Sequence, residues 1–276
     1  MIVDRSVSPA RWRGVLLTCT VLAAPLAAED DRPATVGLVG WFDSQESATL
    51  FTDVEGTQPS VAAGDGIALW KSRVGAAALK QAEPAERPIR VADSPGDQWA
   101  LELPKNSAWM GTSDLTSVVA AEDWTIFLVL SLDSSSTGGE NLLQVRSGRH
   151  MRGFMVKHRC RRCVHFDWND DEEIHTPHEL DGGWNLVDAT SVARVVKVWT
   201  NGNFEGTNSE FTTIGSSELT DGVLVLGART EKKFPDPFPT MFGFIGEILI
   251  YDCPLEDEEL MATREYLMKK WKIEAR

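Results

Sequence analysis

Positive charge is scarce in this sequence. The chain has 276 residues, of which 27 are Lys or Arg and 41 are Asp or Glu, so the formal net charge is −14. An acidic excess repels phosphate backbones and anionic lipid surfaces unless a local basic patch overrides it. Outside the N-terminus, no apolar run approaches the roughly 18 to 20 residues that cross a bilayer. We therefore expect neither a nucleic-acid partner nor a transmembrane span in the mature chain.

Common catalytic motifs are also missing. The sequence contains no Gly-x-Ser-x-Gly nucleophile elbow and no His-Glu-x-x-His metal-binding helix. What it does contain is enough apolar surface for a sizeable core, since 42% of the residues are hydrophobic and 25% are charged. The chain is therefore expected to fold.

The N-terminus has the pattern of a secretory signal peptide. Arg5, Arg11 and Arg13 precede an apolar stretch over residues 14–26, which ends at a small-residue cleavage site before Glu29. This pattern predicts removal of residues 1–28 and a secreted, periplasmic or cell-surface protein, although an uncleaved anchor stays open. Lipidation is not expected, because the residue before Cys19 is neither Gly nor Ala.

Short segments rich in β-branched and aromatic residues recur about every ten residues, which predicts stacked antiparallel strands. The eleven expected strands are Val36–Phe42, Trp99–Leu103, Trp124–Leu132, Asn141–Arg146, Gly153–His158, Val164–Trp168, Ile174–Leu180, Trp184–Ala189, Val195–Thr200, Val223–Arg229 and Phe244–Tyr251. Asn201-Gly202 signals a two-residue hairpin.

Helical periodicity occurs over Glu256–Trp271, with acidic residues first and lysines last. The Pro- and Ala-rich stretch Gln81–Gly96 is interpreted as a surface loop, so residues 29–276 are expected to form one domain.

Several stretches resemble a known family. The opening Val36-Gly-Leu-Val-Gly-Trp-Phe-Asp-Ser and Gly64-Asp-Gly-Ile-Ala-Leu-Trp-Lys-Ser are similar to the start of bacterial laminin-G-like domains of the concanavalin A-like lectin/glucanase superfamily. The ending, from Phe244-Ile-Gly-Glu-Ile-Leu-Ile-Tyr through Tyr266-Leu-Met-Lys-Lys-Trp, resembles the last strand and closing helix of that family. The resemblance implies an all-β jelly-roll sandwich with one C-terminal helix. Such folds host carbohydrate binding, protein adhesion and glycoside hydrolysis, so fold alone does not choose among them.

Enzymes of this superfamily carry acids along one strand as Glu-x-Asp-x-x-Glu, and that motif is absent. We therefore predict no catalytic residue. The leading hypothesis is an exported, non-catalytic module that recognises a glycan or an extracellular protein through loops at one rim. A glycoside hydrolase or lyase with unrecognised acids, and a structural adhesion domain, remain the alternatives.

Cysteines are few, and two of them fall in one expected hairpin. A two-residue turn would place Cys160 opposite Cys163 and His158 opposite His165, and would bring Cys163 level with His178. Three interpretations stay open: a disulfide, a zinc site formed by these two cysteines and His158 with His165, or otherwise paired thiols. The turn would point Arg161 and Arg162 outward, toward an anionic ligand group or merely into solvent. Cys253 is interpreted as a buried or inert thiol.

Two further sets of residues are candidates for binding. Asp170, Asp171 and Glu173 lie in an acidic turn that could hold calcium or could simply be solvated. Trp70, Trp109 and Trp168 flank loops and are the candidates for sugar stacking. The tryptophans expected in the core are Trp41, Trp124, Trp184 and Trp199.

Export generates the first testable prediction. N-terminal sequencing of the protein made by its native host should find Glu29 as the first residue, with the product outside the cytoplasm. An intact Met1 on a cytoplasmic product would contradict the signal-peptide interpretation.

Overall fold

The computed structural model describes residues 32–92, 94–115, 118, 121–133, 141–147, 150–156, 162–168, 172–180, 182–208, 223–231 and 234–275. Residues 31–276 belong to one compact unit. The predicted signal peptide lies outside the described residues and stays a prediction. In the described part of the chain, no helix combines the length and apolar character needed to cross a bilayer.

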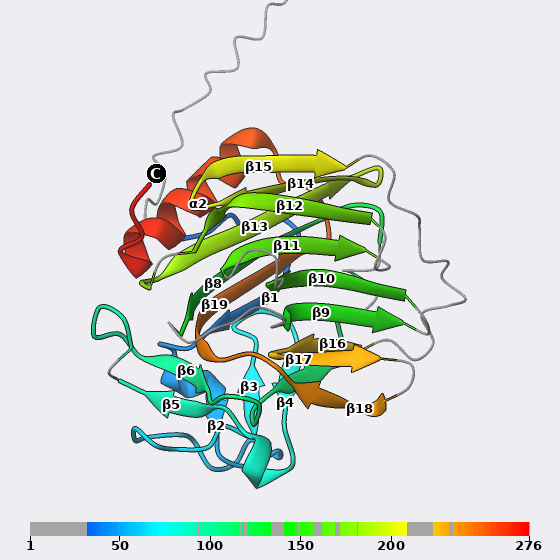
Figure 1. Ribbon diagram of the computed structural model, residues 1–276. Coiled ribbons are helices and arrows are strands. Elements are labelled where there is room, and N and C mark those ends of the chain that lie inside the picture. Colours follow the sequence, from blue (N-terminus) through cyan, green and yellow to red (C-terminus); the bar gives the residue numbers. More distant parts are fainter. Residues whose placement is uncertain are drawn as a thin grey trace, which may run out of the picture. The chain divides into compact units, whose positions relative to one another are not determined.

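Two antiparallel sheets form the fold (Figure 1). Sheet A runs in the order β15 (Asn203–Asn208), β14 (Val195–Thr200), β13 (Asn185–Val192), β8 (Trp124–Leu132), β19 (Gly243–Tyr251), β6 (Ala100–Leu103) and β5 (Ile89–Val91), and β1 (Leu38–Asp43) pairs with β19. Sheet B runs in the order β12 (Glu172–Glu179), β11 (Cys163–Trp168), β10 (His150–Val156), β9 (Asn141–Ser147), β16 (Val223–Leu226), β7 (Met110–Thr112), β4 (Ala78–Lys80), β3 (Leu69–Lys71) and β2 (Leu50–Phe51).

The remaining elements are short, apart from the C-terminal helix. Strands β17 (Ala228–Glu231) and β18 (Phe234–Pro239) form a separate pair, and η1 (Ser47–Thr49) and η2 (Pro84–Glu86) are single 3-10 turns. Helix α2 (Asp257–Trp271), red in Figure 1, lies against sheet A. The prediction of an all-β sandwich with a C-terminal helix is confirmed.

Side chains that alternate along β8 enter two different cores. Ile126 and Leu128 lie in the core between the sheets, whereas Phe127 and Val129 lie in a second core that α2 shares through Leu267. Every residue of β8 is therefore buried. Cover on both faces explains why this strand is an almost continuous apolar run instead of an alternating one.

Several predicted elements match the structure closely. The bounds of β8 and β14 agree with the expected strands, and Asn201-Gly202 joins β14 to β15 with both residues at positive φ, as the hairpin signal predicts. Glu256 is the N-cap of α2, and its side chain forms a capping box with Glu259.

Other predictions need correction. The expected strand Val223–Arg229 is two strands, because the chain turns at Gly227 with φ of 78°. The stretch Gln81–Gly96 is not loop throughout, since it supplies strand β5 at the edge of sheet A. Pattern alone missed the shortest strands, because two or three residues are too few to show an alternation.

One buried ion pair fastens α2 to sheet A. The Nε and Nη2 atoms of Arg264 donate to Asp188 Oδ2 over 3.0 and 2.6 Å, and the guanidinium group lies 4.1 Å from the ring centre of Trp199. Asp188 is completely buried. Burial raises the pKa of Asp188 to about 6, and the charge of Arg264 offsets this only in part.

Replacing Arg264 should therefore destabilise the fold strongly. The variant Arg264→Met leaves the Asp188 carboxylate buried without its counter-charge, and we expect a loss of about 3 to 5 kcal/mol in urea unfolding at pH 7.5. The matched control is Arg194→Met, because Arg194 meets Glu122 across 3.6 Å with both side chains about half exposed. The control should cost less than about 1 kcal/mol. Equal losses in the two variants would contradict this assignment.

Candidate functional site

A pocket of about 490 Å³ lies beside the C-terminal half of α2. Its lining combines carboxylates, amide, cations and a phenol from three parts of the chain: Asp43, Gln45, Glu46, Arg73, Tyr266, Lys269 and Lys270. Asp43 ends β1, and Arg73 follows β3. Tyr266 and Lys270 are four residues apart on α2, so both side chains lie on one face of the helix.

Glu247 is a completely buried carboxylate that contacts two pocket-lining residues, Tyr266 and Lys270. Its Oε1 accepts from Trp41 Nε1 at 2.6 Å and from the Tyr266 hydroxyl at 3.3 Å. Its Oε2 accepts from Lys270 Nζ and from Trp271 Nε1, both at 2.7 Å. Four donors from β1 and α2 therefore surround one acid from the middle of β19.

Asp43 links this network to the pocket wall. Its Oδ2 lies 2.7 Å from Arg73 Nη1 and 2.8 Å from Lys270 Nζ, while Oδ1 accepts from the Gln45 backbone at 3.1 Å. The Arg73 guanidinium stacks 3.8 Å from the ring centre of Trp41. Lys270 is thus shared by two carboxylates.

The electrostatic state of the network follows from its burial. Burial raises the pKa of Glu247, and the nearby Asp43 raises it further, while Lys270 acts in the opposite direction. Burial and the Glu247 charge also raise the pKa of Tyr266, so its hydroxyl stays a donor. The two carboxylates of the network are balanced by Arg73 and Lys270, and Glu46 and Lys269 add one further charge of each sign to the pocket wall. The site therefore offers donors and acceptors without a large net charge.

The Gln45 side chain adds an unusual feature. In the described part of the chain its Nε2 atom is buried without a hydrogen-bond partner, although the residue lines the pocket. Buried polar atoms are nearly always hydrogen-bonded in native proteins. This amide is therefore a buried, unpaired donor on a residue of the pocket wall.

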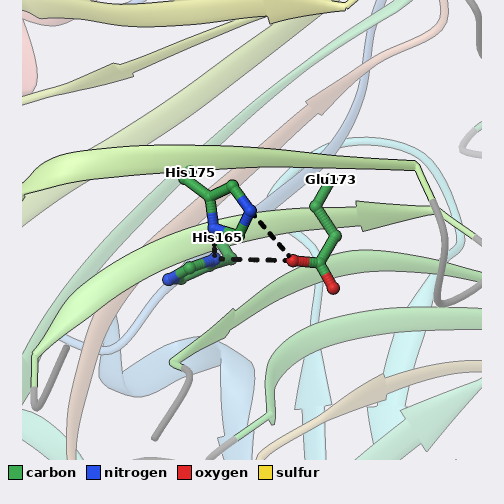
Figure 2. Close-up of side chains that lie close together, drawn as sticks. All are labelled: His165, Glu173 and His175. Atoms are coloured by element: carbon green, nitrogen blue, oxygen red, sulfur yellow. Dashed lines mark hydrogen bonds and ion pairs between the residues drawn. The ribbon is translucent and has the colours of Figure 1, made fainter. Parts of the chain in front are cut away.

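A second polar cluster lies on the other sheet (Figure 2). His165 comes from β11, and Glu173 and His175 come from β12. The Nδ1 atoms of the two histidines are 2.7 Å apart, and Glu173 Oε2 lies 3.2 Å from His175 Nε2 and 4.0 Å from His165 Nδ1. His165 is buried, Glu173 half-buried and His175 exposed.

The predicted zinc set is not assembled as expected. Sheet register pairs His165 with Met155 and Val156 with Val164, so His165 is not the cross-strand partner of His158. Cys163 pairs with Glu179 instead of lying level with His178. His158, Cys160 and Arg161 lie outside the described residues, and Arg162 is half-buried.

The cysteines are only partly described. Cys163 is a buried, disulfide-bonded cysteine. Its predicted pairing with Cys160 stays a prediction, since Cys160 is not among the described residues. Cys253 is a free, half-buried thiol whose pKa is raised by burial, which agrees with the expectation of an inert thiol.

Of the three candidate stacking tryptophans, Trp70 was wrongly chosen. Its ring is completely buried and packs edge-on against Phe42, with 5.6 Å between ring centres, because β3 is a covered strand of sheet B. Trp109 is half-buried and its Nε1 donates to Glu86 over 2.8 Å. The side chain of Trp168 is not described. Those of Trp41, Trp124 and Trp184 are buried as predicted, and Trp199 is half-buried.

The proposed calcium site is described only at Glu173, since Asp170 and Asp171 lie outside the described residues. In the structure Glu173 meets two imidazoles, which are not calcium ligands. Sequence reasoning missed the network around Glu247. The one available signal was an acid in the middle of the apolar strand Phe244–Tyr251.

No family model and no curated protein matches this chain. Solved structures match it by fold. The sialidase of Trypanosoma rangeli in complex with sialic acid is 13% identical with a TM-score of 0.54, over 86% of this chain and 34% of the sialidase. This chain therefore spans about a third of the length of that protein, and the likeness shows the sandwich fold.

Two smaller structures resemble the chain more weakly. The CBM40 of Ruminococcus gnavus IT-sialidase, bound to α2,3 sialyllactose, is 21% identical with a TM-score of 0.48, over 60% of this chain and 96% of the module. Domain 4 of a GH43 extracellular arabinanase from Geobacillus stearothermophilus, in complex with arabinotriose, is 15% identical with a TM-score of 0.47, over 84% of this chain and 100% of the domain.

The shared lysine generates a prediction about pH. Because the pKa of Glu247 is raised, the folded state keeps a proton at pH values where the unfolded state has released it, so stability falls as pH rises through that range. Lys270→Met should enlarge this fall. We expect a loss of about 3 kcal/mol at pH 8 and a clearly smaller loss at pH 4.5, measured by urea unfolding.

The control for this variant is Lys269→Met, which removes the exposed neighbouring lysine. Its effect should stay within about 0.5 kcal/mol at both pH values. A loss in Lys270→Met that is the same at pH 4.5 and pH 8 would contradict the proposed role of Lys270 as the counter-charge of Glu247.

Proposed function

We propose that the protein is an exported, non-catalytic carbohydrate-binding module that holds a glycan in the pocket beside α2. The observation that carries this proposal is the buried Gln45 amide at a pocket wall, a donor that has no partner in the described part of the chain. Rotation of the Gln45 side chain toward the pocket would let a ligand hydroxyl supply the missing acceptor.

The chemistry of the pocket suits a saccharide. Sugars present many hydroxyl groups, each of which both donates and accepts, and the pocket offers both kinds of partner within a small space. Its carboxylates and cations balance, so the site favours an uncharged or weakly charged polar ligand. The phenol of Tyr266 adds an apolar ring face. A volume of about 490 Å³ lies in the range of small-ligand pockets, whereas a protein partner needs a wide contact surface.

The structural neighbour supports the same ligand class. The Trypanosoma rangeli sialidase that shares the fold is described in complex with sialic acid. We take from it only the class of ligand, a saccharide, and place that ligand in a pocket formed by this chain's own residues.

A catalytic alternative would need an acid with a raised pKa that reaches the substrate. Glu247 has the raised pKa, but its side chain is completely buried and its two oxygens accept four hydrogen bonds. A glycosidic oxygen would have to displace one of these donors. The geometry therefore favours a structural carboxylate and a binding function over glycoside hydrolysis.

The test is a glycan array probed with the full mature chain, followed by titration calorimetry on the best glycan. We expect saturable binding that falls about five- to tenfold in Gln45→Ala, the loss expected for one hydrogen bond to a neutral group. The same glycan incubated with the protein should yield no new reducing ends. His175→Ala is the matched control on the other sheet and should bind as tightly as the unchanged protein.

Three outcomes contradict the proposal. If no glycan binds, a structural adhesion role replaces it. Equal affinity of Gln45→Ala and the unchanged chain would move the site away from this pocket. Release of reducing ends that stops after an acid-to-amide substitution would favour the hydrolase alternative.

A further inference from the structure

Strand geometry brings three metal-ligating side chains to one face of sheet B. Glu173 and His175 are two residues apart on β12, so both side chains leave the strand on the same side. His165 of β11 is the direct cross-strand partner of His175. The residues between them, such as Phe166 and Ile174, enter the core between the sheets. The three polar side chains therefore share the outer face of the sheet.

The distances in this cluster fit one bound ion. Zinc lies about 2.0 to 2.2 Å from nitrogen and carboxylate ligands, so two ligand atoms of one ion are at most roughly 4.3 Å apart. His165 Nδ1 lies 2.7 Å from His175 Nδ1 and 4.0 Å from Glu173 Oε2. The 3.2 Å contact of Glu173 Oε2 is with His175 Nε2, the other nitrogen of that ring, so only one of the two nitrogens can serve the ion. The three potential ligand atoms lie within 4.8 Å of one another, so only small side-chain rotations are needed. Figure 2 shows both rings and the carboxylate close together, with different nitrogens of His175 facing His165 and Glu173.

The donor set selects the class of metal. Two imidazoles and one carboxylate are ligands of zinc and related divalent transition metals, whereas calcium and magnesium prefer sites made of oxygen alone. We propose that His165, Glu173 and His175 bind a divalent transition-metal ion of the zinc class.

Proton chemistry supports this assignment. The two histidines meet through their Nδ1 atoms, so one ring must place a proton between the two nitrogens. A metal ion takes the place of that proton and binds both lone pairs.

An ion bound at this position would have two effects. Strand β12 is at the edge of sheet B, and the ion ties it to β11 through His165. Three protein ligands also leave the fourth tetrahedral position open to water or to an oxygen of a ligand. The cluster lies on sheet B, whereas the pocket lies beside α2 on sheet A, so this inference is independent of the proposed glycan site.

The experiment uses the full mature chain without an affinity tag, treated with a chelator and then titrated with Zn²⁺ alone by calorimetry. We expect one ion per chain, a higher Tm with zinc than without it, and the visible absorption of four-coordinate cobalt when Co²⁺ replaces zinc. His175→Ala should weaken binding at least tenfold, and Glu173→Gln should weaken it less. Because His175→Ala also removes the 2.7 Å partner of the buried His165, the quantity compared is the rise in Tm on adding zinc, which should be lost in this variant.

The matched control is His178→Ala. His178 is on the same strand and is 54% exposed, but it meets Glu205 of β15 at 2.9 Å and is not part of the cluster. This variant should keep the zinc affinity of the unchanged chain. Absence of saturable binding in the unchanged chain, or binding that His175→Ala leaves intact, would overturn the proposal.

Discussion

The need to bury the Glu247 carboxylate shapes this end of the sandwich. An acid in the middle of β19 is costly unless donors surround it, and the donors come from Trp41 of β1 and from the last turns of α2. The neighbouring Gly246 belongs to the same constraint, because a Cβ there would lie 2.8 Å from the ring of Trp271. Helix α2 can therefore approach β19 closely, and its Lys270 reaches both Glu247 and the pocket.

The two candidate sites lie beside different parts of the packing. The core between the sheets holds the sandwich together, and the second core holds α2 on the outer face of sheet A. Strand β8 contributes to both cores, so the helix and the sandwich are packed against the same strand. Residues of the helix form one wall of the pocket. The histidine cluster lies on the outer face of the other sheet. Each site depends on packing that the other does not share.

The sequence predicted the fold better than the sites. Strands such as Trp124–Leu132, and the helix with its caps, are local patterns, so they could be read directly. The Glu247 network could not, because Trp41 and Glu247 are 206 positions apart and meet only through sheet topology. The histidine cluster depends on register: a two-residue turn was assumed, whereas the structure pairs Val156 with Val164. Trp70 was misjudged because its short strand is covered from both sides.

We propose that three residues of the Glu247 network, Asp43, Tyr266 and Lys270, line a saccharide pocket. The most direct measurement is an NMR titration of ¹⁵N-labelled protein with a glycan, observed through the tryptophan side-chain Nε1–H signals. We expect the Nε1–H signal of Trp41 to shift and saturate together with binding. The Nε1–H signal of Trp124, which is buried between the sheets, should stay in place. Saturable binding that leaves Trp41 unchanged and shifts Trp109 instead would contradict it.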